Sequence, residues 1–208
     1  MLKPKIIIPV IIVIASVIFV SVFSGYDDSP AANATGFTYS DTQKIKNILY
    51  SKDIFMSSPT VISDYTVKEY CMYFDEQKQS QVMSYCLTSA LTDSQGTPLG
   101  NLNMGGDSEH AKMALAIIES SPSLNSQENS VETVFETMIQ TLVCDCWEHQ
   151  KPGGFESIKS WINAAQSYHE NSGKTTTTSN ISGLADMHLT LEITKTDNSY
   201  LWTLIIIK

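Results

Sequence analysis

The stretch HLTLEITKTDNSYLWTLIIIK, residues 188–208, decides the fold. Apolar and polar residues alternate on both sides of Asp197 and Asn198, a pattern typical of a β-hairpin with a tight turn. This turn pairs six apolar residues across one face of the hairpin: Ile193 with Trp202, Leu191 with Leu204, and Leu189 with Ile206. The opposite face carries Leu201 and Ile205, so it is less polar than a face open to water. We therefore predict that the hairpin lies inside an antiparallel sheet and is partly covered on both sides.

Strands and helices are also expected before this hairpin. The strands are expected at residues 67–75, 81–91 and 97–104, and the helices at residues 40–50, 108–120, 129–150 and 155–171. A run of strands, then helices, then a strand pair predicts an α+β fold. We expect an extracytoplasmic domain with one antiparallel sheet, made of a β-meander plus the C-terminal hairpin, and three to four helices packed on one face of it.

Short polar motifs set the expected ends of these elements. Capping boxes open two of the helices: Ser40 with Gln43, and Asn129 with Glu132. The sequence GNLNMGGD at residues 100–107 is expected to end the third strand and cap the helix 108–120, in a turn that could also hold an anion. The low-complexity sequence ENSGKTTTTSNISG at residues 170–183 is interpreted as a loop.

The N-terminal segment predicts a membrane anchor. Lys3 and Lys5 precede residues 6–23, IIIPVIIVIASVIFVSVF, which carry no charge. A helix of this length is about the minimum that spans a hydrocarbon core of about 30 Å. A cleaved signal peptide is the alternative, although its apolar region is usually only about 7–15 residues long. Because lysines mark the cytoplasmic side, we expect the N-terminus in the cytoplasm and the rest of the chain outside the cell membrane.

The expected domain organisation has three parts. Residues 1–25 are predicted to form a cytoplasmic stub and a single transmembrane anchor, residues 26–39 a linker, and residues 40–208 the extracytoplasmic domain. N-glycosylation sequons begin at Asn33 and Asn180. Both sequons lie in polar stretches that suit surface loops, so both are candidate glycosylation sites.

The charge balance excludes one class of partner. The chain has 13 basic and 22 acidic residues and contains no arginine. Because Lys3 and Lys5 are the only charged residues before Tyr26, the part after the anchor has 11 basic and 22 acidic residues, a formal charge of −11. Nucleic-acid-binding proteins show basic patches and read guanine with arginine. We therefore expect no nucleic acid as a partner, and interpret the acidity as a source of solubility.

Two of the four cysteines are predicted to face each other in the sheet. A turn at Lys78 and Gln79 pairs the first two strands so that Cys71 lies directly opposite Cys86. Opposed residues of an antiparallel pair have Cα atoms about 4.5–5.5 Å apart. That separation falls inside the disulfide range of about 4.4–6.8 Å. A Cys71–Cys86 bridge is therefore geometrically allowed.

The other two cysteines lie in VCDCWEHQ, residues 143–150. In the predicted helix, Cys144 and Cys146 point about 200° apart and cannot bond to each other, whereas Cys146 and His149 share a face. Two interpretations stay open. One is a structural zinc site of the Cys₃His type, built by Cys71, Cys86, Cys146 and His149. The other is disulfide bonding of all four cysteines, which an even cysteine number in an exported domain favours.

Catalytic signatures are missing from the sequence. The chain has no HExxH, GxSxG, P-loop or GxGxxG motif, and its histidines are scattered singly: His110, His149, His169 and His188. We therefore expect no catalytic residues, no cofactor and no enzymatic activity. The favoured function is a single-pass membrane-anchored accessory or binding domain whose partner is another protein of the cell envelope. A metal-binding or thiol-redox envelope protein is the alternative, and an anchored hydrolase is a third hypothesis.

Overall fold

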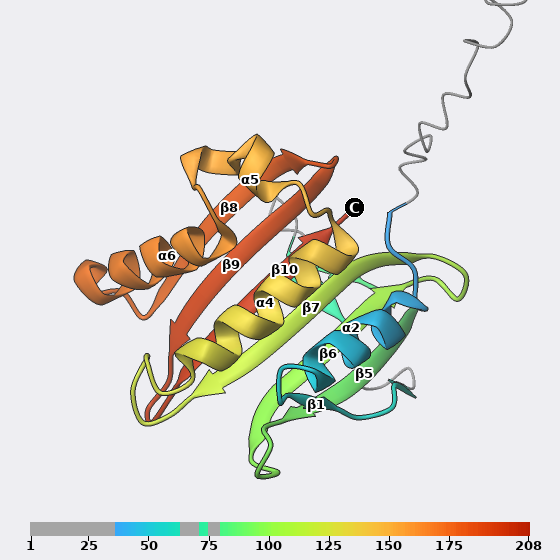
Figure 1. Ribbon diagram of the computed structural model, residues 1–208, viewed down its shortest axis with the longest axis horizontal. Helices are drawn as coiled ribbons and strands as arrows, with labels where there is room; N and C mark the ends of the chain where they lie inside the picture. The colour runs from blue at the N-terminus through green and yellow to red at the C-terminus, as the bar shows by residue number, and fades with distance from the viewer. Residues whose placement is uncertain (1–35, 63–70, 75–79) are drawn as a thin grey trace, which may run out of the picture. The chain divides into compact units, whose positions relative to one another are not determined.

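The computed structural model describes residues 36–62, 71–74 and 80–208 of the chain (Figure 1). Residues 36–208 belong to one compact unit. The predicted anchor, most of the predicted linker and Asn33 lie outside the described residues. Over the described ranges, no helix is both long and apolar enough to cross a membrane.

The order of elements is that of an α+β protein. The helices are α2 (Asp41–Tyr50), α4 (Glu128–Leu142), α5 (Trp147–Gln150) and α6 (Ile158–Ser172), with a 3₁₀ turn at Pro152–Gly154. The strands before α4 are β1 (Phe55–Met56), β2 (Thr60–Val61), β3 (Met72–Phe74), β4 (Ser80–Val82), β5 (Tyr85–Thr92), β6 (Pro98–Gly106) and β7 (Ala111–Ser120). The strands after α6 are β8 (Thr176–Leu184), β9 (Met187–Lys195) and β10 (Tyr200–Ile207). The predicted α+β class is confirmed.

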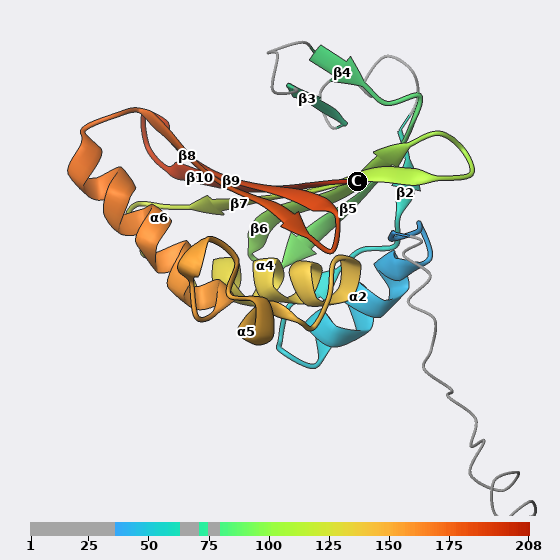
Figure 2. The ribbon, with the colours of Figure 1, turned by 90° about the horizontal axis from the view of Figure 1, so that it is seen from above.

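One large antiparallel sheet organises the unit. In the described part of the chain it has eight strands, in the order β1-β5-β6-β7-β10-β9-β8, with β2 also paired to β5. Helices α2, α4 and α6 cover one face, and the small β3–β4 sheet lies on the other side (Figure 2). The main core lies between this face and the helices, and its largest fully buried side chains include Trp161, Trp202 and Phe135.

The C-terminal hairpin has the predicted register. Three cross-strand pairs match the prediction: Ile193 with Trp202, Leu191 with Leu204, and Leu189 with Ile206. All six side chains are at most 1 % exposed. The second edge of β10 pairs with β7, so the hairpin lies inside the sheet as expected. Burial at every second residue therefore identified both the strands and their alignment.

The predicted helix 108–120 is wrong, because these residues form the hairpin turn and strand β7. β7 is a central strand between β6 and β10. Its Ala114 and Ala116 pack in the main core beneath the helices, whereas Met113 and Leu115 pack in a second cluster on the other face. A strand covered on both faces is apolar almost throughout, and such a run lacks the alternation that separates a strand from a buried helix.

The predicted loop 170–183 is also wrong. Gly173, in the left-handed conformation, ends α6, and the chain then forms the edge strand β8. Thr177 and Ile181 of β8 are buried, whereas Thr178 and Asn180 are exposed. The repeated threonines are β-branched residues that favour strands, and their burial alternates. Asn180 therefore lies on a strand rather than in a loop, with its side chain exposed.

The predicted capping boxes do not form. Ser40, before α2, accepts no hydrogen bond through its side chain at the helix start, and Asn129 lies inside α4, which begins at Glu128. Helix α6 instead begins with a capping box in which Ser157 and Ser160 bond each other's backbone N–H. The long predicted helix 129–150 also ends early, because α4 stops at Leu142 and α5 is a separate short helix.

The first hairpin is shorter than predicted and has another register. β3 pairs with β4 so that Met72 faces Val82, whereas the predicted register, with Cys71 opposite Cys86, would place Tyr85 opposite Met72. Tyr85 instead belongs to β5 and pairs with Gly106 of the large sheet. The chain therefore leaves the small sheet at Val82 and enters the large one, which the assumption of a single long hairpin could not anticipate.

Candidate functional site

The cysteines lie in two separate pairs. Cys71 and Cys86 are disulfide-bonded, with Cα atoms 6.0 Å apart. Both are fully buried in the second cluster with Met113 and Leu115, on the sheet face away from the helices. This is the bridge that the sequence allowed, although the predicted register that suggested it is wrong. The bond joins the residue before β3 to the large sheet.

Cys144 and Cys146 form the second disulfide, with Cα atoms 5.1 Å apart. The prediction that they cannot bond is wrong, because it assumed a helix where the chain has already left α4. His149 is exposed on α5. The structure thus does not bring Cys71, Cys86, Cys146 and His149 together, and no cluster of three or more potential metal ligands occurs over the described residues.

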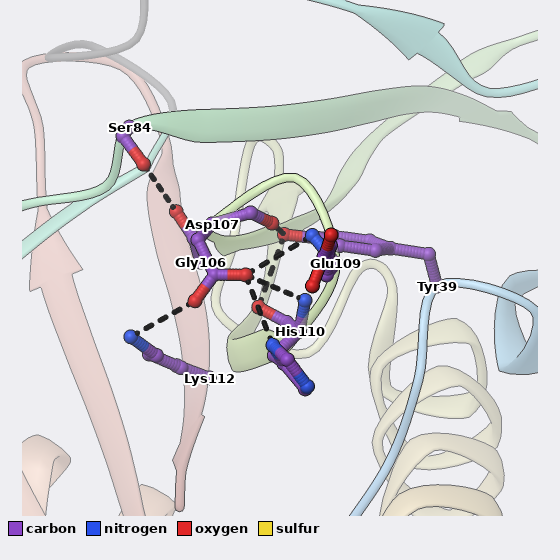
Figure 3. Close-up of polar contacts among 7 residues, drawn as sticks. All are labelled: Tyr39, Ser84, Gly106, Asp107, Glu109, His110 and Lys112. Atoms are coloured by element: carbon purple, nitrogen blue, oxygen red, sulfur yellow. Dashed lines mark hydrogen bonds and ion pairs between the residues drawn. The ribbon is translucent and has the colours of Figure 1, made fainter.

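A dense polar cluster lies at the turn between β6 and β7 (Figure 3). One carboxylate oxygen of Asp107 accepts hydrogen bonds from the backbone N–H groups of Glu109 and His110, at 3.0 and 2.7 Å. Lys112 pairs with the other oxygen at 3.2 Å. These bonds hold the pKa of Asp107 well below its usual range, chiefly through the His110 backbone. The sequence predicted that this segment caps a helix, but the Asp107 carboxylate closes a hairpin turn instead.

Tyr39 fastens the beginning of the described unit to this turn. Its hydroxyl donates to the carbonyl oxygen of Asp107 at 2.7 Å, and its ring contacts Tyr85 edge-on. Burial and the Asp107 charge raise the pKa of Tyr39 to about 12, so the phenol keeps its proton. The polar groups of this cluster bond to one another, and we interpret it as a structural clamp.

The best candidate for a binding site is a cleft at the opposite end of the sheet. It has a volume of about 480 Å³ and lies beside the C-terminal end of α6. Six residues give it its chemical character: Asn125, His169, Glu170, Lys174, Lys195 and Tyr200. They come from the loop before α4, from the end of α6 and the loop that follows it, and from the β9–β10 hairpin. We call this site the α6 cleft.

His169 lies at the inner wall of the α6 cleft. Its side chain is buried, and its Nδ1 atom is 2.9 Å from the hydroxyl of Thr177. The ring contacts Tyr200 edge-on, with the ring centroids 5.9 Å apart. Burial lowers the pKa of His169, and the positive charge of Lys195 lowers it further, against the opposing effect of Glu170. The buried site therefore favours the neutral form of the imidazole.

Two lysines line the α6 cleft without a counter-ion. Neither Lys174 nor Lys195 forms an ion pair with a described residue. The Lys195 ammonium lies 6.0 Å from the centre of the Tyr200 ring, and the Lys174 ammonium lies 3.4 Å from the hydroxyl of Tyr168. Both ammonium groups rest beside aromatic rings, which attract cations without neutralising them.

The α6 cleft and the beginning of the described unit lie at opposite ends of β10. Tyr200, at the start of β10, lines the cleft. Gly36 lies against the side chain of Lys208, directly after the end of β10. An eight-residue strand is about 25 Å long. Gly36, the first described residue, therefore lies at the end of the sheet that is remote from the cleft.

Sequence reasoning missed the α6 cleft. Its residues come from three segments that only the folded chain brings together, and the sequence around Lys174 looked like a loop. His169 was noticed, but only as one of four scattered histidines. Its helical spacing from Trp161 and Ala165 indicated an inward-facing side chain, which is the one signal that could have drawn attention to it.

No family model matches the chain, and no curated protein or solved structure is significantly similar to it. The function must therefore be argued from the residues of this chain alone.

Proposed function

We propose that the protein is a single-pass membrane-anchored extracytoplasmic domain that binds a ligand or a partner through the α6 cleft. The observation that carries the proposal is the position of this cleft. It lies at the Tyr200 end of β10, whereas Gly36 lies at the Lys208 end. A domain tethered through Gly36 therefore has its cleft at the end that is farthest from the tether, where a ligand outside the cell has access.

The hydrophobic segment supports the membrane attachment. Residues 6–23 have no charge and follow Lys3 and Lys5, which favours a cytoplasmic N-terminus. The same segment would export the chain even if it were cleaved as a signal peptide. In both cases, residues 36–208 lie outside the cytoplasm.

The two disulfides support a location outside the cytosol. Disulfides persist in oxidising surroundings outside the cytosol. The described residues contain no free cysteine, since Cys71 is bonded to Cys86 and Cys144 to Cys146. A disulfide-bonded cysteine offers no thiolate to a metal, so this pairing favours the binding domain over the metal-binding alternative.

The hydrogen bonds in the α6 cleft favour binding over catalysis. The hydroxyl that pairs with the His169 imidazole is that of Thr177, which is buried and does not line the α6 cleft, and the Glu170 carboxylate accepts a hydrogen bond from Gln166. A hydrolase needs a nucleophile within hydrogen-bond reach of a base that is itself oriented by a third group. The proposed partner is another protein of the cell envelope or a small molecule that it presents.

The experiment that tests this proposal is a topology assay on the full chain in intact cells. We expect the protein to stay in the membrane fraction after an alkaline carbonate wash, and protease added outside the cells to digest residues 36–208. The mass of the purified protein should include residues 1–5. A protein found in the cytosol, or a domain protected from the added protease, would contradict the proposal, and loss of residues 1–23 would replace the anchor with a signal peptide.

Alkylation of the cysteines in the same purified protein tests whether the disulfides form, and so tests the proposed location outside the cytosol. Without reductant, a thiol reagent should leave all four cysteines unmodified, whereas prior reduction should expose them. Two or more reactive thiols before reduction would favour the thiol-redox or metal-binding alternative.

A further inference from the structure

We propose that the α6 cleft binds the carboxylate or phosphate group of a small molecule. The inference rests on the proposed function, because it assigns a chemical class of ligand to the exported domain. It follows from the polar atoms that remain available in the cleft once the contacts within the protein are made.

Gln166 determines which polar atoms of its neighbours remain available. Its Nε2 amide donates to Oδ1 of Asn125 at 2.7 Å and to Oε1 of Glu170 at 3.3 Å. The acceptor of the Asn125 side chain is thus used within the protein. Its Nδ2 group has no acceptor in the described part of the chain, so both of its N–H donors are available to a ligand.

His169 adds a donor of the same kind. Thr177 occupies its Nδ1 atom, so Nε2 is the ring nitrogen that remains for a ligand. With the Thr177 hydroxyl donating to Nδ1, the neutral ring carries its proton on Nε2 and can donate it. The inference assigns this tautomer to the bound state.

The charges in the cleft favour an anion. Lys174 and Lys195 bring two positive charges, and Glu170 brings the one negative charge among the described cleft residues. Five other described lysines form ion pairs: Lys44, Lys52, Lys112, Lys151 and Lys159. In a chain of net charge −9, two lysines that form no ion pair with a described residue therefore give this cleft a local excess of positive charge.

The available atoms together define the ligand. Two ammonium groups, an amide and an imidazole all donate hydrogen bonds, so the ligand must supply acceptor oxygens and negative charge. Carboxylates and phosphates do both. The volume of about 480 Å³ falls in the range of about 300–1,000 Å³ that is typical of small-molecule sites. It exceeds what one anionic group fills, and the ring of Tyr200 offers a surface for the rest of the molecule.

The test is a titration of the ¹⁵N-labelled full chain in detergent micelles, followed by NMR at constant ionic strength. The probes are sodium phosphate in one arm and sodium succinate in the other. We expect saturable shifts of the backbone amides of Lys174, Thr175 and Tyr200. Saturation with phosphate alone assigns a phosphate ligand, and saturation with succinate alone assigns a carboxylate ligand.

Lysine variants separate a built site from general attraction of anions. Lys174→Gln and Lys195→Gln should each weaken binding about tenfold, because each removes one charge-assisted hydrogen bond. Lys46→Gln is the matched control, since Lys46 lies on α2 and forms no ion pair with a described residue. It should leave binding unchanged.

Two results would overturn the inference. One is the lack of saturable shifts with both anions, and the other is equal weakening by Lys46→Gln. Because these measurements need no membrane orientation, they fail or succeed independently of the topology assay that tests the proposed function.

Discussion

Removing the Cys71–Cys86 disulfide should destabilise the protein much more than removing Cys144–Cys146. Cys71 and Cys86 are 15 residues apart in the sequence, whereas Cys144 and Cys146 are 2 residues apart. A disulfide stabilises mainly by restricting the unfolded chain, and this restriction grows with the length of the closed loop. The expected loss in the free energy of unfolding is about 3 kcal/mol for the longer loop and about 1.5 kcal/mol for the shorter one.

The position of the longer loop adds to this effect. Cys71 and Cys86 are fully buried against Met113 and Leu115, on the sheet face away from the helices. Without the bond, Cys71 is held at this face by weaker contacts, among them the hydrogen bond from the Met83 backbone N–H to the Cys71 carbonyl at 3.2 Å. If Cys71 leaves the sheet, Met113 and Leu115 become more exposed to water.

The assay is thermal unfolding of the full chain in detergent micelles, followed by circular dichroism. Cys71→Ala with Cys86→Ala is compared with Cys144→Ala with Cys146→Ala, so both variants lose two sulfur atoms. A loss of about 3 kcal/mol lowers the Tm of a domain of this size by about 6–12 °C, and the second variant should lose about half of that. Equal losses, or a larger loss in the Cys144 and Cys146 variant, would refute the reasoning from loop length.

Three further predictions concern individual side chains. Tyr39→Phe removes the hydrogen bond to Asp107 and should lower the unfolding free energy by about 1 kcal/mol, measured by urea denaturation; an unchanged midpoint would contradict the clamp. The lowered pKa of Asp107 gives stability that is present above about pH 4 and lost as the pH falls toward the folded-state pKa, so Asp107→Asn should flatten the acid side of a Tm-against-pH curve. The lowered pKa of His169 likewise gives stability that is lost as the pH falls below about 6.5, and His169→Gln should remove this loss between pH 7 and pH 5; an identical slope in the variant would contradict the neutral buried ring.

The sequence predicted the strands in which buried and exposed residues alternate. The C-terminal hairpin was found with its exact pairs, because Leu189, Leu191 and Ile193 are buried at every second position next to a clear turn. β7 was mistaken for a helix because both of its faces are covered, so its sequence has no polar face. The break after α4 was missed because a covalent bond between Cys144 and Cys146 fixes the chain there.

The candidate site was beyond the reach of sequence patterns. The α6 cleft joins Asn125, His169 and Lys195, which are far apart in the chain. Its position depends on β8 being a strand and on the pairing of β10 with β7. Neither was predicted, because residues 170–183 were interpreted as a loop and residues 108–120 as a helix. The proposed location outside the cytoplasm, in contrast, rests on residues 6–23 and on the even number of cysteines. These features can be read from the sequence without knowledge of the fold.

The position of the cleft at the far end of the sheet from Gly36 has a mechanical consequence. A pulling force between a bound ligand and the tether would act along the strands. The N–H···O=C bonds of an antiparallel sheet are perpendicular to its strands, so such a load stretches many of them together instead of opening them one after another. The weakest link would then lie where the tether joins the sheet, at buried Phe37 and the Tyr39 hydroxyl on the β6–β7 turn. With the tether and the cleft ligand that we propose, such a load would not unfold the domain from the cleft inwards.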